Sequence, residues 1–120
     1  MIYLASPYSH PDHAVMEDRF NAVCRVSAKL MLRGVLLFSP IAHTHPIAVA
    51  GELPRGWDFW HAYDRWFVSN CDELWVLRLD GWRESKGVSA EIALAVEYSK
   101  AVVYLREDGE RDANITEEYD

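Results

Sequence analysis

Several features are scarce in this sequence of 120 residues, and each scarcity excludes a class of protein. The two cysteines, Cys24 and Cys71, show neither metal-binding nor redox spacing. No apolar stretch approaches the roughly 18 residues that cross a membrane, and no secretory signal precedes the first apolar run. No basic stripe is present, which argues against binding to duplex nucleic acid. We therefore expect a cytoplasmic protein with no metal, no cofactor and no membrane partner.

Acidic residues are concentrated at one end of the chain. The formal net charge is −7, and residues 107–120 carry −6 of it, with seven acids against one arginine. The chain length fits one domain. We expect this domain to span residues 1–106. Residues 107–120 are predicted to form a solvated, partly disordered acidic tail.

Continuous apolar runs alternate with segments of helical spacing. The runs predict buried strands over residues 2–5, 35–38, 74–79 and 101–105. The helical segments cover residues 12–34, 57–70 and 88–99. A loop of about 17 residues is expected after Pro40, and its length is typical of a functional loop. This order predicts an α/β fold with a parallel sheet covered by helices on both faces.

Ligands of open parallel sheets bind at the carboxyl ends of the strands, which singles out residues 6–10, 39–45 and 80–91. Glu91 lies one turn into the helix after the third strand, between the apolar Val88 and Ala95. We therefore expect its carboxylate on or beside the buried face. A helix N-terminus favours a charged carboxylate, so we expect Glu91 to stay ionised. A helix-dipole role and a nucleophilic role are both open from spacing alone.

Asp64 interrupts an aromatic stripe formed by Trp57, Trp60 and Phe67. A buried acid is costly unless it is paired or used. Asp64 is therefore either a core residue bonded to a backbone amide or to Arg65, or a second carboxylate of an active site.

Three further polar residues stand near predicted strand ends. Asp80 precedes Gly81, where turn chemistry competes with a role in substrate binding. His43 and His45 stand two apart, but no third ligand has the spacing of a metal site. We expect both histidines to lie near a substrate.

Four segments carry a resemblance to a known family: YLASPYSHPD, FSPIAHTHPIA, WDFWHAYDRW and CDELWVLRLDGWRESKGVSAEI. Over about residues 2–105, the chain resembles the nucleoside 2-deoxyribosyltransferase superfamily, and most of all a small branch of unassigned function. Relatives include deoxyribosyltransferases and hydrolases of nucleoside 5'-monophosphates. The resemblance implies a flavodoxin-like (Rossmann-like) three-layer sandwich with a central parallel sheet of four to five strands. It also implies a homodimer or larger homo-oligomer.

The resemblance implies a role for each matching position. Glu91 matches the nucleophile of a Ser-x-Gly-x-x-x-Glu arrangement, and Asp64 matches the acid/base residue. Tyr3 matches a tyrosine that orients the glutamate. The positions implied for substrate and phosphate binding are Ser85, Gly87, Tyr8, Ser9 and His10. The family's Gly-rich phosphate turn is replaced by Pro7-Tyr8-Ser9-His10.

Base recognition does not carry over from the family. His43, His45, Trp57 and Trp60 are candidates for a base and sugar pocket, by stacking or hydrogen bonding.

The expected function is hydrolysis of the N-glycosidic bond of a nucleoside 5'-monophosphate, releasing the free base and a (deoxy)ribose 5-phosphate. Base exchange by a deoxyribosyltransferase is one alternative. A nucleotide-sensing module without turnover is another, and a purely interacting protein with an acidic tail is a third.

Overall fold

Four short strands form one parallel sheet in the order β2-β1-β3-β4. The computed structural model describes residues 1–54 and 56–112, without the side chain of Trp57. The strands are β1 (Ile2–Ala5), β2 (Leu37–Phe38), β3 (Glu73–Leu77) and β4 (Ala101–Leu105). The described residues thus form four strands, which agrees with the prediction of four to five. β1 is central, and its Tyr3 pairs in register with Phe38 of β2 and Leu74 of β3.

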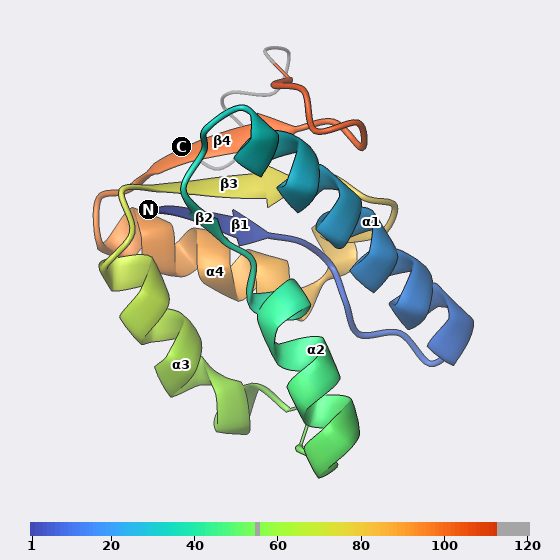
Figure 1. Ribbon diagram of the computed structural model, residues 1–120. Helices are drawn as coiled ribbons and strands as arrows, with labels where there is room; N and C mark the ends of the chain where they lie inside the picture. The colour runs from blue at the N-terminus through green and yellow to red at the C-terminus, as the bar shows by residue number, and fades with distance from the viewer. Residues whose placement is uncertain (55, 113–120) are drawn as a thin grey trace.

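Helices cover both faces of the sheet, as expected for a flavodoxin-like three-layer sandwich (Figure 1). The elements are α1 (His13–Leu32), α2 (Pro40–Gly51), α3 (Trp57–Ser69) and α4 (Lys86–Glu97), with a 3-10 turn η1 (Trp82–Glu84). Because side chains alternate along a strand, Leu4 faces α1, whereas Tyr3 and Ala5 face α3 and α4. No helix in the described ranges is long and apolar enough to cross a membrane.

α1 begins and ends where the sequence predicts. The Asp12 side chain accepts a hydrogen bond from the Ala14 amide at 2.9 Å and caps the helix. Gly34 follows the last turn at φ +88°, a left-handed conformation that favours glycine. Both signals are local, which is why the sequence reveals them.

The predicted loop after Pro40 is wrong, because most of it is helix α2. The Ser39 hydroxyl accepts from the Ala42 amide at 3.1 Å, and Pro40 occupies the first turn, where its missing N–H is harmless. Pro46 lies inside the helix and removes one backbone hydrogen bond. The Ser39 cap and the packing of Ile41 against the core support the helix despite this lost bond.

Two strands are shorter than predicted, and α4 begins earlier. The Val35 amide donates to the Leu30 carbonyl, so it belongs to the end of α1 rather than to β2. The Leu79 amide donates to Leu77 in a turn, which ends β3. Ser85 caps α4, so Gly87 lies inside its first turn rather than before it.

The described part of the acidic segment folds back on the domain. Gly109 turns the chain at φ +86°, and the Asp112 amide donates to the Tyr104 carbonyl. Asp112 also forms an ion pair with Arg78. Glu110 pairs with Lys29 and Arg33 of the region that ends α1. Residues 107–112 are thus anchored, and residues 113–120 of the predicted tail lie outside the described residues.

Ser39→Ala should lower the free energy of unfolding by about 1 kcal/mol, because it leaves a first-turn amide of α2 without its cap. Urea denaturation measures this change. Ser89→Ala is the matched control, since Ser89 is an exposed residue within α4. Equal stability of the two variants would contradict a capping role for Ser39.

Candidate active site

Three side chains from three different elements meet on one face of the sheet. The Tyr3 hydroxyl, from β1, lies 3.2 Å from Asp64 Oδ1 of α3. The same hydroxyl is hydrogen-bonded to Glu91 Oε2 of α4. Sequence separations of 61 and 88 residues are closed by the packing of α3 and α4 beside β1. The structure thus brings together the three residues expected to be catalytic.

The hydrogen bonds of this triad require a shared proton. A tyrosine hydroxyl carries one proton, whereas an ionised carboxylate only accepts. Tyr3 can therefore donate to one carboxyl group, and the second bond forms only if the other carboxyl group is protonated and donates to the Tyr3 oxygen. One proton on the two carboxyl groups satisfies both contacts.

Burial favours that singly protonated state. Glu91 is only 5% exposed, and its burial, followed by the nearby Asp64 charge, raises its pKa well above the ordinary range. Burial also raises the pKa of Asp64 to about 6, although the Tyr3 hydrogen bond opposes the shift. The expectation that the helix N-terminus keeps Glu91 ionised is therefore wrong for Glu91 taken alone. Desolvation outweighs the helix dipole, and the pair titrates as a unit.

The two carboxyl groups contact the same hydroxyl oxygen, which keeps them close together. Glycosidases use a pair of carboxyl groups, and the separation of the pair differs between the two mechanisms. Retaining pairs are about 5–5.5 Å apart, whereas inverting pairs are about 6.5–9.5 Å apart to admit a water molecule.

Ser85 and Gly87 lie at the N-terminus of α4, one turn before Glu91. The Ser85 hydroxyl accepts from the Val88 amide at 3.2 Å, and its own proton can still be donated to a ligand. A Cβ on Gly87 would meet only Ser85 Oγ, at an ordinary 3.9 Å. Protein packing therefore does not explain the glycine at this position.

The turn after β1 and the turn after β3 lie at the same edge of the sheet. Ser9 and His10 are exposed and Tyr8 is half-buried. One side chain connects the two turns: Arg19 of α1 donates to the carbonyls of Ser9 and Asp80. We did not single out Arg19 from the sequence, because nothing in its local pattern distinguishes it from an ordinary polar residue of a helix.

His45 has protein partners at both ring nitrogens. Nε2 lies 3.1 Å from Glu17 Oε2, and Nδ1 is hydrogen-bonded to the Tyr8 hydroxyl. The ring also stacks on Phe20, with 4.2 Å between the ring centroids. These contacts join α2 to α1 and to the turn after β1, and the substrate contact of His45 stays a prediction.

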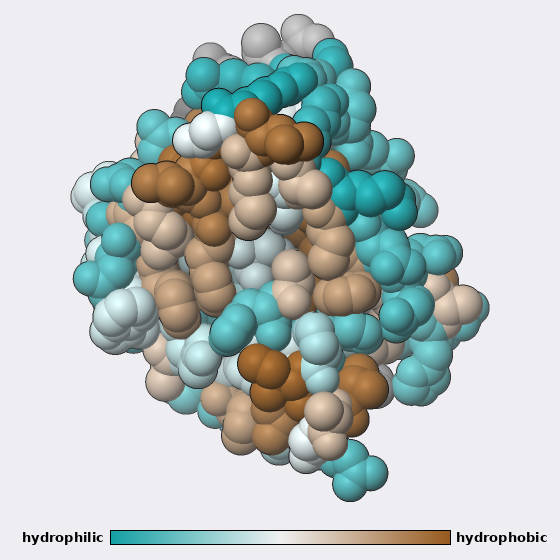
Figure 2. All heavy atoms as spheres, in the orientation of Figure 1, coloured by the Kyte–Doolittle hydropathy of each residue, from teal (hydrophilic) through white to brown (hydrophobic). Residues whose placement is uncertain are grey.

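His43 and Trp60 line a common pocket of about 220 Å³ between α2 and α3. Its other lining residues are Thr44, Ile47, Leu53, Phe59 and Tyr63. Figure 2 shows hydrophobic residues gathered over the C-terminal part of α2. Aromatic contacts connect the pocket to the triad, from Tyr63 through Phe67 and Phe38 to Tyr3. The side chain of Trp57 lies outside the described residues.

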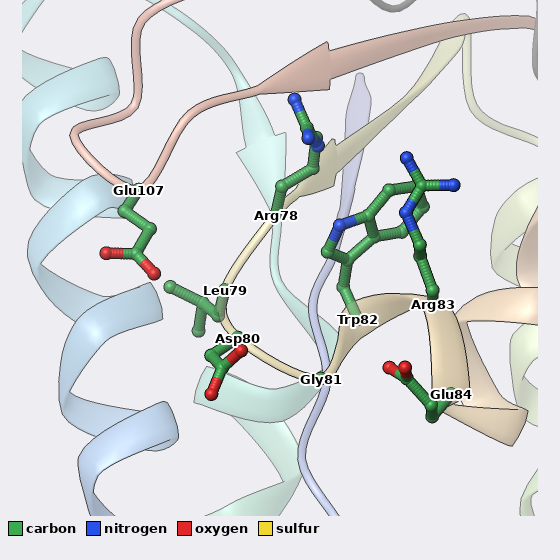
Figure 3. Close-up of a pocket in the computed structure, with 8 residues that line it drawn as sticks. All are labelled: Arg78, Leu79, Asp80, Gly81, Trp82, Arg83, Glu84 and Glu107. Atoms are coloured by element: carbon green, nitrogen blue, oxygen red, sulfur yellow. The ribbon is translucent and has the colours of Figure 1, made fainter.

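A second pocket, of about 410 Å³, lies around the turn after β3 and is lined by Asp80 (Figure 3). The guanidinium groups of Arg78 and Arg83 lie 5.4 and 4.7 Å from the Trp82 ring centroid. The Asp80 side chain points away from them. Neither of these two pockets is lined by a residue of the triad. In the described ranges, no cluster of three His, Cys, Asp or Glu could hold a metal.

The fold and the triad define an α/β protein of the flavodoxin-like class with a pair of carboxyl groups, one buried and one half-buried, at one face of its sheet. Comparison with protein families matches residues 1–107 to the Domain of unknown function (DUF1937). The chain therefore belongs to the DUF1937 family. A search of curated proteins found no match.

The raised pKa of Asp64 predicts a pH dependence of stability. Because this pKa is about 6 in the folded protein and about 3.9 in an unfolded chain, the folded state binds more protons between these values. The free energy of unfolding should therefore fall as the pH rises from about 4 to 6. Asp64→Asn should reduce this fall by on the order of 2 kcal/mol.

Urea denaturation at a series of pH values measures this dependence. Asp58→Asn is the control, because it removes one acid from an exposed position of the same helix. An unchanged slope in Asp64→Asn would show that Asp64 does not hold its proton in the folded state.

Proposed function

We propose that this protein cleaves the N-glycosidic bond of a nucleoside 5'-monophosphate, with Glu91 as nucleophile and Asp64 as acid/base. The observation that carries the proposal is the pair of carboxyl groups, Glu91 buried and Asp64 half-buried, joined by the Tyr3 hydroxyl. A close pair of carboxyl groups suits a retaining mechanism. The resemblance of the Ser85–Glu91 arrangement to nucleotide N-hydrolases gives the substrate class.

Glu91 is the more deeply buried acid and holds the shared proton at rest. In the reactive form this proton has moved through the Tyr3 hydroxyl, which leaves Glu91 ionised and Asp64 protonated. Tyr3 then donates its proton to Glu91, which stabilises the carboxylate in its buried position. Glu91 attacks C1' of the sugar, and the bond from C1' to the base nitrogen breaks as Asp64 protonates the base. Asp64, now ionised, takes a proton from a water molecule as the water oxygen attacks C1'. The bond between C1' and Glu91 breaks, and Glu91 leaves as a carboxylate. This step restores the starting proton on Asp64.

The N-terminus of α4 is the proposed phosphate-binding element. Helix N-termini attract anions through free amides and the helix dipole. The Ser85 hydroxyl can donate to a phosphate oxygen, and Gly87 leaves room for close approach. Binding energy from the phosphate then holds the sugar in position for attack by Glu91.

The pocket between α2 and α3 is the proposed base-binding element. Trp60 stands four residues before Asp64, so it lies about 6 Å along the helix axis from the proposed acid. A leaving base must lie against its acid, and this pocket begins one turn away. Its volume of about 220 Å³ and its aromatic lining suit a single planar ring system.

We also propose that the protein works in the cytoplasm as a homodimer or larger homo-oligomer. Leu32 and Leu36 are 90% and 80% exposed, and an interface between copies would remove such apolar side chains from water.

Glu91→Gln should lower turnover by roughly a thousandfold or more, because an amide cannot attack C1'. Chromatography of the free base released from a panel of nucleoside 5'-monophosphates measures the effect. Glu97→Gln, an exposed site on the same helix, is the matched control. With a 2-fluoro-2-deoxynucleotide, mass spectrometry should find the sugar phosphate attached to Glu91.

The same assay separates the alternatives. Transfer of the sugar to an added second base would indicate a deoxyribosyltransferase. Tight nucleotide binding that persists in Glu91→Ala, without product from the wild type, would indicate a sensing module. An active Glu91→Gln variant would contradict the proposed nucleophile.

Trp60→Ala should raise the KM for nucleotides about tenfold or more, because stacking on an aromatic ring contributes roughly 1–3 kcal/mol per base. Steady-state kinetics measures the change. Trp66→Ala is the control, since Trp66 is 60% exposed on the same helix and does not line the pocket. Equal KM values for the two variants would place the base elsewhere.

A further inference from the structure

Arg19 connects two strand-end turns that are far apart in the sequence. Its Nη1 donates to the carbonyls of Tyr8, at 3.4 Å, and Ser9, at 3.0 Å. Its Nη2 donates to the carbonyl of Asp80 at 3.1 Å. The described residues include no carboxylate that pairs with Arg19. Its fork of donors is therefore directed at backbone carbonyls of the turns after β1 and β3.

Gly81 makes room for this guanidinium. A Cβ at this position would lie 2.5 Å from Arg19 Nη2, and the residue has φ +87°. The backbone conformation therefore favours glycine, and a Cβ here would displace the Arg19 guanidinium. Gly34 has a matching φ of +88°, but a Cβ there would meet nothing within 4 Å. The two glycines separate the effect of backbone strain from the effect of displacing Arg19.

Binding of the three carbonyls also orients three amide groups. In a planar trans peptide, the N–H points opposite to the C=O of the preceding residue. The N–H groups of Ser9, His10 and Gly81 therefore point away from Arg19. Within residues 1–54 and 56–112, none of these three N–H groups donates to a protein acceptor. Free amides in adjacent turns are a common way of binding an anion.

We propose that Arg19 is a positioning residue that holds the Ser9, His10 and Gly81 amides together as a binding site for a phosphate monoester. This inference rests on the proposed function for its ligand, the 5'-phosphate of the substrate. It adds the turn after β3 to the phosphate site and assigns its alignment to α1. Arg19 itself makes its bonds to the protein rather than to the reacting atoms.

The test uses the full chain in a Glu91→Gln background, with ribose 5-phosphate as the probe. Titration followed by amide NMR should shift the Ser9, His10 and Gly81 signals. Arg19→Met and Gly81→Ala should each weaken ribose 5-phosphate binding about tenfold or more, because charge-assisted bonds to phosphate depend on aligned donors. Arg19→Lys should restore part of the affinity. Gly34→Ala should bind the probe as the parent does.

Kinetics with the Arg19 and Gly81 variants in the otherwise wild-type chain provides a second readout. kcat/KM should fall more steeply for nucleoside 5'-monophosphates than for the same nucleosides without phosphate, a difference that a general loss of structure would not produce. The double variant Arg19→Met/Gly81→Ala should be no worse than either single variant, because both disrupt the same contact.

Three results would overturn the inference: absence of shifts at the three amides, unchanged probe binding in Arg19→Met and Gly81→Ala, or equal weakening by Gly34→Ala. Failure of the proposed function is recognised separately. A chain that binds ribose 5-phosphate with the expected dependence on Arg19 but cleaves no nucleotide would refute the glycosidase and keep the Arg19 site. Nucleotide cleavage that is unaffected by the Arg19 variants would support the glycosidase and refute the Arg19 site.

Discussion

The Tyr3 hydroxyl has one proton and lies between two carboxyl groups, of which Glu91 is buried and Asp64 half-buried. Two ionised carboxylates in this position would repel each other with little solvent to screen them. The contacts are satisfied when Asp64 and Glu91 hold one proton between them. The same proton that makes the triad stable in the fold is the proton that a leaving group would need, so structure and proposed chemistry have a common requirement.

The central strand holds this arrangement in place. β1 pairs with both β2 and β3, and Tyr3 is completely buried between its neighbours. α3 and α4 pack on the same face of the sheet and supply one carboxyl group each. Ionising a buried acid costs stability, so the triad is expensive for a domain of this size. The apolar clusters on both faces of the sheet offset that cost.

The predictions that were wrong or incomplete share a physical cause: each concerns contacts between segments that are distant in the sequence. α2 replaces a predicted loop: Pro46 is unfavourable inside a helix, whereas the Ser39 cap and the packing of Ile41 support it. The contacts of His45 with Tyr8 and Glu17 were not predicted, because both partners belong to distant segments. The role of Arg19 is equally hidden, because its acceptors are backbone carbonyls that every sequence contains.

The sequence by itself determined the α/β class, the four strands and the face on which Glu91 lies, because periodicity, caps and glycine turns act over a few residues. It also drew attention to Asp64, the one acid on an aromatic face. Only the tertiary structure decided that Tyr3, Asp64 and Glu91 share a hydroxyl, and that burial raises the pKa of both acids. Desolvation and charge coupling depend on distances between separate elements, and local sequence patterns do not contain those distances.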